Sequence, residues 1–172
     1  MEVYKSFSTE RLILRPTSIE DAEFILKLMN SPKWIKNIGD RHVDTLKDAE
    51  DYISNRMRPQ LKKLGYGNYT VIRKSDNQKI GTCGLYDREG LEDVDIGFAF
   101  LPSYEKQGYG FEAAHKIMNI AFSEFGIESI CGITSKTNKA SQKLLIKLGL
   151  RYEGPTHLPN EEEELALYRI KQ

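Results

Sequence analysis

A pair of glycines stands where a strand-like run meets a long amphipathic helix, and this junction limits the folds open to the chain. The stretch "YEKQGYGFEA" follows the apolar run "DIGFAFLP" and carries Gly108 and Gly110 one residue apart. From Gly108 onward, apolar residues recur at spacings of three and four as far as Phe125, which is typical of a helix with one buried face. A strand, a tight turn and a helix in this order predict an α/β architecture.

Apolar spacing and capping residues predict the other elements. Thr17 with Glu20, and Thr45 with Asp48, have the spacing of capping boxes, so each pair is expected to begin a helix. The expected order is a strand at 7–15, a helix at 17–30, a loop at 31–44, a helix from 45 to about 58 or on to 64, a hairpin of strands at 67–74 and 79–86, a strand at 90–102, the helix from 108, a strand at 126–136, a helix at 138–149, and two strands near 150–154 and 164–170.

This order predicts one mixed sheet with helices on both faces. Two strands joined through a helix normally pair in parallel, so we expect a parallel pair near Ile96 and Ile130 in an otherwise mostly antiparallel sheet of about six to seven strands. Gly97, inside its strand, is expected to mark a bulge. The 172 residues suffice for one hydrophobic core, and no repeat or linker divides them, so we expect a single domain spanning 1–172.

Composition argues against several classes of protein. Lys+Arg and Asp+Glu both number 25, and a net charge of zero disfavours broad nucleic-acid binding. No apolar run approaches the ~20 residues that cross a membrane, and the N-terminal stretch lacks the apolar segment of a signal peptide. Cys83 and Cys131 have no metal-site spacing, so the simplest interpretation is two buried, reduced thiols in a cytoplasmic protein without a metal.

The glycine pair has two interpretations. The first N–H groups of a helix have no intrahelical partner, and the helix dipole makes that end partly positive, so an anion is favoured there. In this interpretation a diphosphate is held by Lys106, Gln107, Gly108, Tyr109 and Gly110, because glycine lets the backbone approach closely. In the other, the glycines serve only a tight turn. The pattern is neither a dinucleotide fingerprint nor a P-loop.

Three stretches carry a wider pattern. They are "STERLILRPTSIEDAEFILKLMN", "DIGFAFLPSYEKQGYGFEA" and "TNKASQKLLIKLGLRYEG", and they stand in order at natural spacings over nearly the whole chain. Together they resemble the GNAT acetyltransferases, and within that family the RimJ/RimL-like branch that acetylates the N-termini of ribosomal proteins.

The resemblance implies acetyl-CoA as the cofactor, held in a splay between the parallel strands. The diphosphate would lie on the amides of Gln107 to Gly110. Main-chain groups near Phe100 and Leu101 would pair with the pantetheine arm like an added strand. Asn138 would hydrogen-bond the pantetheine region, and Ser141 would face the thioester sulfur.

The chain departs from the family pattern at two positions. Glu105 stands where the acyl-CoA signature usually has Gln or Arg, and a carboxylate beside a diphosphate is unfavourable unless it points away or pairs with a lysine. Leu145 appears where many GNAT enzymes outside this branch carry a tyrosine as general acid. These departures keep a second function open, a catalytically weak acyl-CoA-binding or interaction module on the same fold.

The implied reaction moves an acetyl group from the thioester directly to a primary amine within a ternary complex. The amine must be neutral to attack, and its pKa is about 8 for an α-amino group and about 10.4 for lysine. A base acting through water is therefore expected. Asp95 is the candidate base, with Asp93 in reserve; alternatively, both lie on a solvated strand edge without a catalytic role. Ser141 is the candidate donor to the leaving sulfur; alternatively, it is an ordinary residue of the first turn of its helix.

The acceptor side is the least defined part of the sequence. Trp34, Asp93 and His157 are the candidate acceptor-binding residues, although packing is the more common role for a residue like Trp34 and an ordinary loop position for one like His157. The acidic run "NEEEEL" at 160–165 is either a solvated turn or an attraction for a cationic amine. The acceptor is expected to be a protein N-terminal α-amino group or a small amine, and a homodimer through exposed strands is compatible with the sequence.

Overall fold

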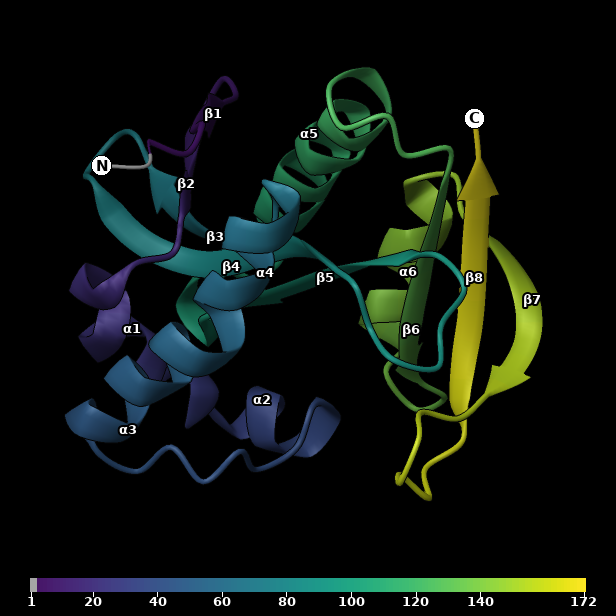
Figure 1. Cartoon of the computed structure of the whole chain (residues 1–172), viewed down its shortest axis with the longest axis horizontal. Coiled ribbons are helices and arrows are strands. Elements are labelled where there is room, and N and C mark those ends of the chain that lie inside the picture. The colour runs from purple at the N-terminus through teal and green to yellow at the C-terminus, as the bar shows by residue number, and fades with distance from the viewer. Residues whose placement is uncertain (1–2) are drawn as a thin grey trace.

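One mixed sheet of eight strands runs through the molecule in the order β1-β2-β3-β4-β5-β6-β8-β7 (Figure 1). The structure, a computed structural model, describes residues 3–172. The strands are β1 (Phe7–Ser8), β2 (Leu12–Pro16), β3 (Asn68–Arg73), β4 (Gln78–Tyr86), β5 (Val94–Phe100), β6 (Ser129–Ser135), β7 (Arg151–Thr156) and β8 (Leu165–Lys171). All neighbours are antiparallel except β5 and β6, which are parallel.

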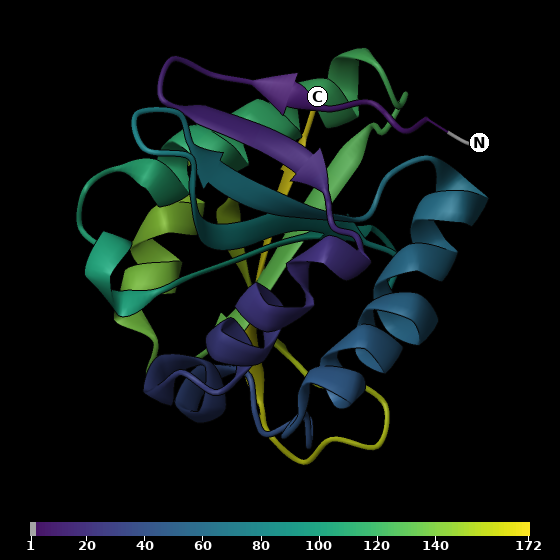
Figure 2. The same cartoon turned by 90° about the vertical axis from the view of Figure 1, so that its left-hand side faces the viewer.

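Helices cover both faces of the sheet, as predicted (Figure 2). They are α1 (Ala22–Met29), α2 (Pro32–Asn37), α3 (Leu46–Tyr52), α4 (Arg58–Leu64), α5 (Tyr109–Ser123) and α6 (Lys139–Lys147). A π-helical turn, Ile53–Met57, joins α3 to α4, so the helix predicted from residue 45 continues to Leu64. Helices α5 and α6 pack on one face around Ile117 and Leu145, and α1 and α3 pack on the other around Ile25 and Ala49.

The sheet has more strands than the sequence predicted because the first expected strand folds back on itself. The turn around Thr9–Arg11 separates β1 from β2, and Phe7 pairs with Leu14 across the hairpin. The N–H of Thr9 donates to the carbonyl of Leu12 at 2.9 Å and closes the turn. An apolar run interrupted by "STER" therefore makes two short strands, not one.

The entry into α1 also differs from the prediction. Ser18, not Thr17, caps the short 3₁₀ turn Ile19–Asp21 that leads into the helix, and its capping-box partner is Asp21. Thr17 is buried instead, and its hydroxyl lies 2.9 Å from that of Thr70. A neighbouring residue with the same capping chemistry shifts the start of the helix by one position.

The segment 31–44, predicted as a loop, contains α2. Pro32 occupies the first turn of this helix after the cap residue Ser31. Proline is tolerated there because the N–H that it lacks would have no partner in the helix. Pro32 therefore begins a helix where the sequence predicted a loop, and this helix places Trp34 in the lining of the central cavity.

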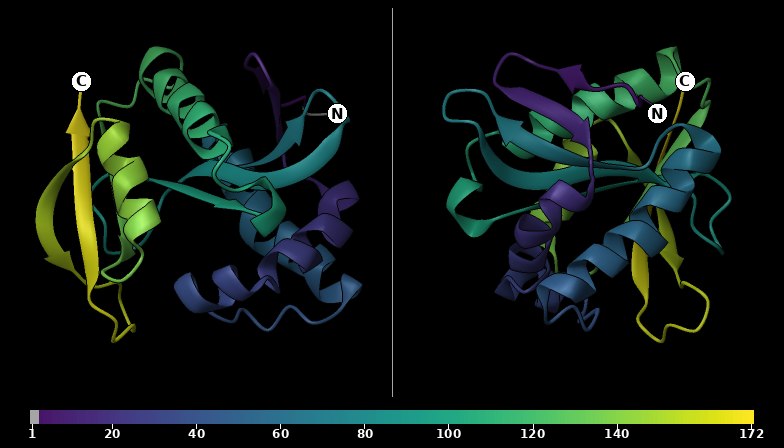
Figure 3. Two further views of the ribbon diagram at one scale, coloured as in Figure 1. Left: turned by 180° about the vertical axis from the view of Figure 1, so that it is seen from behind. Right: turned by 60° about the vertical axis from the view of Figure 1, so that its left-hand side comes forward.

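The parallel pair separates almost as soon as it forms. Only Val94 with Ile130 and Asp95 with Cys131 are in register, and beyond them β5 and β6 diverge. Figure 3 shows β5 running away from β6 and β8, with α5 on one side of the gap and α6 on the other. The predicted splay between two parallel strands is confirmed, and Asp95 stands at its apex.

Gly97 does not mark a bulge, because the pairing of β4 with β5 is unbroken from Gly81 to Tyr86. It makes room for a ring instead. A Cβ at Gly97 would lie 2.7 Å from Tyr86 Cε2, and a Cβ at Gly84 would lie 2.9 Å from the Tyr86 hydroxyl oxygen. The two glycines let the Tyr86 ring lie flat on the sheet.

Candidate active site

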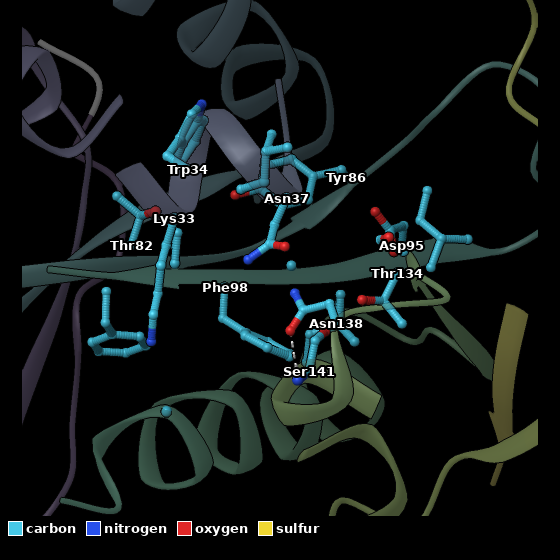
Figure 4. Close-up of a pocket in the computed structure, with 18 of the residues that line it drawn as sticks. Lys33, Trp34, Asn37, Thr82, Tyr86, Asp95, Phe98, Thr134, Asn138 and Ser141 are labelled. Atoms are coloured by element: carbon cyan, nitrogen blue, oxygen red, sulfur yellow. Dashed lines mark hydrogen bonds between the residues drawn. The ribbon is translucent and has the colours of Figure 1, made fainter. Parts of the chain in front are cut away.

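A cavity of about 890 Å³ lies where β5 and β6 separate. Its lining comes mainly from β4, β5, β6, α2, α5, α6 and the loop before β8. Figure 4 shows side chains of α2, β4, β5, β6 and α6 around it. The predicted site residues that line it are Trp34, Asp95, Phe100, Lys106, Gly108, Tyr109, Gly110, Asn138 and Ser141. The structure does not bring the other four into the lining, and these are Asp93, Leu101, Gln107 and His157.

A row of free backbone amides lies at one end of the cavity. None of the N–H groups from Lys106 to Phe111 donates a hydrogen bond to any residue within 3–172, and the first helical bond of α5 runs from Glu112 to Gly108 at 3.1 Å. The glycine turn therefore ends in the unpaired donors that an anion would satisfy. Lys106 and Gly108 line the cavity, and Gln107 does not.

The backbone conformation explains why glycine is needed here. Gly108 has φ of 84° and Lys106 has φ of 59°, so the turn uses the left-handed region twice. A Cβ at Gly110 would lie 3.3 Å from Leu144 Cδ2 and 3.7 Å from Phe100 Cε2. A larger side chain at 110 would therefore fill the space in front of the amides. These amides fit the diphosphate of a coenzyme.

The edge of β5 that faces β6 has no strand partner between Ile96 and Phe100 within the described residues. An extended ligand can pair with such an edge as an added strand. Leu101 is not part of this edge: its N–H donates to Ile80 at 2.9 Å, its carbonyl accepts from Tyr104 at 3.0 Å, and its side chain is buried. The expected pairing at Leu101 is therefore corrected to the residues before it.

The Glu105 carboxylate does not oppose the amides as a free charge. It forms an ion pair with the ammonium group of Lys33, from α2. The pairing with a lysine is one of the two arrangements that make an acidic residue tolerable next to a diphosphate. It also ties α2 to the turn before α5, since the two partners come from separate parts of the chain.

Helix α6 presents Asn138 and Ser141 to the cavity (Figure 4). Asn138 caps the helix, as predicted, because its Oδ1 accepts a hydrogen bond from the Ser141 N–H at 3.2 Å. This bond leaves the amide Nδ2 of Asn138 and the Ser141 hydroxyl without a partner within 3–172. Leu145 lies one turn further on, is buried and lines the cavity with an apolar side chain.

Asp95 is a buried acid in the cavity lining. Only 2% of the residue is exposed, and its Oδ2 accepts a hydrogen bond from Arg88 Nε at 2.6 Å. Its other oxygen, Oδ1, is buried and has no partner among the described residues. Burial raises the pKa of Asp95 to about 6, although the charge and hydrogen bond of Arg88 act against the rise. A carboxylate with this pKa is ionised at neutral pH yet accepts a proton readily.

The structure adds residues that the sequence did not indicate. The Tyr86 hydroxyl donates to Asn68 Oδ1, and the Arg88 guanidinium lies over the Tyr86 ring, 5.0 Å from its centre. From α2, Asn37 reaches into the cavity opposite Asn138 (Figure 4). Local pattern gave no signal for these residues, because Tyr86 and Arg88 become neighbours of Asp95 only through the pairing of β4 with β5.

Three predicted acceptor residues have different positions. Trp34 lines the cavity and also packs against the core around α1 and α3. Asp93 lies outside the cavity, where its carboxylate accepts a hydrogen bond from Arg169 Nε at 2.6 Å. His157 is exposed in the loop before β8 and does not line the cavity. That loop reaches the cavity through Glu161 and Glu163 instead, which belong to the acidic run of the sequence.

The described chain has neither a candidate membrane-spanning helix nor a candidate metal site. Within residues 3–172, no helix is long and apolar enough to span a membrane, and no cluster of His, Cys, Asp or Glu has the arrangement of a metal site. Both Cys83 and Cys131 are free and buried, and burial raises the pKa of each thiol to about 12.

Comparison with known proteins agrees with this geometry. The chain matches the family model of the acetyltransferase (GNAT) domain over residues 11–151. It is 26% identical over 153 residues to the uncharacterized N-acetyltransferase YoaA of Bacillus subtilis, covering 88% of this chain and 86% of YoaA. It is 29% identical over 149 residues to the uncharacterized N-acetyltransferase p20 of Bacillus licheniformis, covering 85% and 82% of the two chains.

Solved structures share the fold. An acetyltransferase from Agrobacterium tumefaciens superimposes with a TM-score of 0.83 at 22% identity, covering 100% of this chain and 97% of that one. The ribosomal L7/L12 α-N-protein acetyltransferase RimL, in complex with coenzyme A, superimposes with a TM-score of 0.82 at 16% identity, covering 97% and 98%. The family match spans most of the sequence, and the protein therefore belongs to the GNAT family of N-acetyltransferases, which take the acetyl group from acetyl-CoA.

Proposed function

We propose that the protein transfers an acetyl group from acetyl-CoA to an α-amino group by direct attack in a ternary complex, with Asp95 as the base. One observation carries the proposal. A buried carboxylate with an unpartnered oxygen lies at the apex of the splay, in the same cavity as the unpaired amides of the α5 turn. The residues that hold the acetyl donor and the group that receives a proton thus face one space.

The acetyl donor fits the described residues. The amides from Lys106 to Gly110 would hold its diphosphate, and the free edge of β5 would pair with its pantetheine arm. The unpartnered Nδ2 of Asn138 would donate to that arm. When bound, acetyl-CoA supplies an activated acetyl thioester, and all other roles below belong to the protein.

Asp95 serves as the proton acceptor. With a pKa of about 6 it is mostly ionised at pH 7, and its Oδ1 has no partner among the described residues. Because Oδ1 is buried, the proton of the amine would reach it through a water and not by direct contact. Arg88 holds the carboxylate in place through Oδ2. It also keeps the pKa of Asp95 from rising further, because its positive charge favours the ionised form.

Ser141 is placed to assist the leaving sulfur. Its hydroxyl lines the cavity in the first turn of α6 and has no other partner among the described residues. An O–H group that donates to a developing thiolate stabilises it. Leu145 has no proton to give, so no general acid stands at the position where many GNAT enzymes outside the RimJ/RimL-like branch carry a tyrosine.

Three observations favour an α-amino group as the acceptor. A base with a pKa of about 6 is closer to an α-amine, near about 8, than to a lysine amine, near about 10.4, so proton transfer from the α-amine costs less. The structural neighbour RimL is an α-N-protein acetyltransferase. Glu161 and Glu163 in the cavity lining would attract the cationic form of such an amine. A small molecule with an amine of similar pKa remains the second acceptor class.

We place this reaction in the cytoplasm, in keeping with two unpaired thiols, Cys83 and Cys131.

The test is thiol release from acetyl-CoA with a panel of amines. We expect release that depends on peptides with a free α-amino group, weaker release with polyamines and lysine side chains, and none with N-terminally blocked peptides. Binding of acetyl-CoA without amine-dependent thiol release would instead support the alternative function, an acyl-CoA-binding module.

A further inference from the structure

We infer that Arg11 and Glu112 form a clamp that holds the amide turn before α5 in its anion-binding shape, so that both act as positioning residues for the acetyl donor. The inference rests on the proposed function, because it takes the diphosphate to lie on those amides. Arg11 belongs to the turn between β1 and β2, and Glu112 to the first turn of α5.

Glu112 is the anchor of the clamp. Its Oε1 accepts hydrogen bonds from the Thr9 hydroxyl at 2.6 Å and from the Arg11 N–H at 2.9 Å, and its Oε2 accepts from Arg11 Nε at 2.6 Å. Three donors from one short turn thus meet a single carboxylate. The first turn of α5 is fixed to the β1–β2 hairpin by this group.

Arg11 extends the clamp to the amide turn itself. Its Nη1 donates to the carbonyl of Gln107 at 3.0 Å, and its guanidinium carbon lies 4.3 Å from the centre of the Tyr109 ring. A Cβ on Gly108 would lie 3.3 Å from its Nη2. One guanidinium therefore contacts the residues before, at and after the glycine.

The contact with Gln107 sets the direction of a donor. In a trans peptide unit the C=O and the N–H point to opposite sides. Because Arg11 holds the Gln107 carbonyl, the N–H of Gly108 in the same unit is directed away from Arg11, and Gly108 lines the cavity. Without this bond, a turn with two residues in the left-handed region would be free to rotate that unit.

The clamp also offsets the negative charge of Glu112 near the amide turn. A carboxylate in the first turn of α5 would repel a diphosphate bound nearby, but the ion pair with Arg11 offsets the charge of Glu112. The guanidinium additionally stands next to Gly108 and adds positive potential there. Loss of Arg11 should therefore weaken the hold on the diphosphate through both charge and geometry. Loss of Glu112 should weaken it through geometry alone, because Arg11 and the turn before α5 lose their anchor. The thioester end of the site should stay intact in both cases.

Two acetyl donors distinguish a role in positioning the diphosphate site from a general loss of activity or folding. Acetyl-CoA carries the diphosphate, and S-acetylpantetheine offers the same thioester and pantetheine arm without it. In Arg11→Ala and Glu112→Gln, kcat/KM for acetyl-CoA is expected to fall by about tenfold or more, mainly through KM, while kcat/KM for S-acetylpantetheine stays within about twofold of the wild type. An equal loss with both donors, or no loss with acetyl-CoA, would overturn the inference.

Matched variants complete the experiment. Glu124→Gln removes the ion pair between Lys5 and the far end of α5, and it should leave kcat/KM unchanged for both donors. Arg11→Lys keeps the charge but not the fork that reaches Glu112 and Gln107 together, so it should show the same donor-specific loss; wild-type kinetics in this variant would contradict the clamp.

Calorimetric titration with coenzyme A needs no acceptor, so it tests the clamp even if the proposed reaction fails. Unchanged affinity in Arg11→Ala would overturn it.

Discussion

Asp95 and Arg88 form an ion pair at the point where the parallel strands separate, with Arg88 Nε 2.6 Å from Asp95 Oδ2. The pair leaves Asp95 Oδ1 buried and unpartnered within the described chain, and Asp95 lines the cavity in which the amine is expected. The opposing effects of burial and of Arg88 place the pKa of Asp95 at about 6, in the range where a carboxylate changes its charge near neutral pH.

The pH dependence of kcat/KM for the acceptor should report this pKa. Below about pH 6 the Asp95 carboxylate takes up a proton and no longer accepts one from the amine, so the rate should fall by a further factor of about ten for each pH unit. In Asp95→Asn the rate should be lower at neutral pH and the break near pH 6 should be absent. Asp51→Asn, an exposed position on α3, is the control.

An unchanged break in Asp95→Asn would remove Asp95 from the mechanism. If Asp93→Asn abolished the break instead, the base would be Asp93, despite its hydrogen bond with Arg169 outside the cavity.

Gly110→Glu should abolish binding of acetyl-CoA. Its Cβ would meet Leu144 Cδ2 at 3.3 Å, and the carboxylate would occupy and charge the space in front of the amides. Titration calorimetry measures the loss. Asn119→Glu introduces the same carboxylate on an exposed position of α5 and should bind normally. Near-normal affinity in Gly110→Glu would show that the diphosphate lies elsewhere.

Asn138, the cap of α6, and Ser141, in its first turn, should separate stability from catalysis. Ser141→Ala should lower kcat several-fold without a change in the unfolding free energy, because the hydroxyl has no protein partner among the described residues. Asn138→Ala removes the helix cap and should lower the unfolding free energy by about 1 kcal/mol. Single-turnover kinetics and urea unfolding check the two outcomes, and a stability loss in Ser141→Ala with unchanged kcat would reverse these roles.

Asp21→Asn should destabilise the fold at neutral pH by about 2 kcal/mol. The carboxylate is fully buried and accepts hydrogen bonds from Arg15, at 3.0 and 2.7 Å, and from the Thr70 hydroxyl at 3.0 Å, with Lys79 also at 2.8 Å. Burial acts to raise the pKa of Asp21, but the hydrogen bonds from Arg15 and Lys79 outweigh it and lower the pKa.

The sign of this shift fixes the pH range of the effect. The stabilisation by Asp21 is present above its ordinary pKa and is lost as the pH falls through the lowered one. Urea unfolding of the wild type should therefore approach that of Asp21→Asn under acidic conditions. A constant difference between the two proteins across this range would contradict the assignment.

The sequence carried much of the site because its signals are local. The glycines of the α5 turn, the Asn138 cap and the spacing of Ser141 are each read from a few adjacent residues, and the structure shows the cap directly. The position of Asp95 in its strand was predicted as well. Its place at the apex needed the register of β5 with β6, which apolar alternation alone does not supply.

The remaining parts depend on contacts between distant segments. Arg11 and Glu112 are about a hundred residues apart, so no local sequence pattern around either residue predicts their contact. The β1–β2 turn lies inside a run that was predicted as one strand, and α2 begins at Pro32, in a segment that was predicted as a loop. In both cases tertiary packing decided between local structures that the sequence allowed.

The most direct test of the account is a crystal structure of the protein grown with coenzyme A. We expect the diphosphate oxygens within about 3 Å of the backbone nitrogens of Gln107 to Gly110, and the pantetheine arm along the edge of β5. A coenzyme whose diphosphate lies elsewhere, with water on these four amides, would contradict the account.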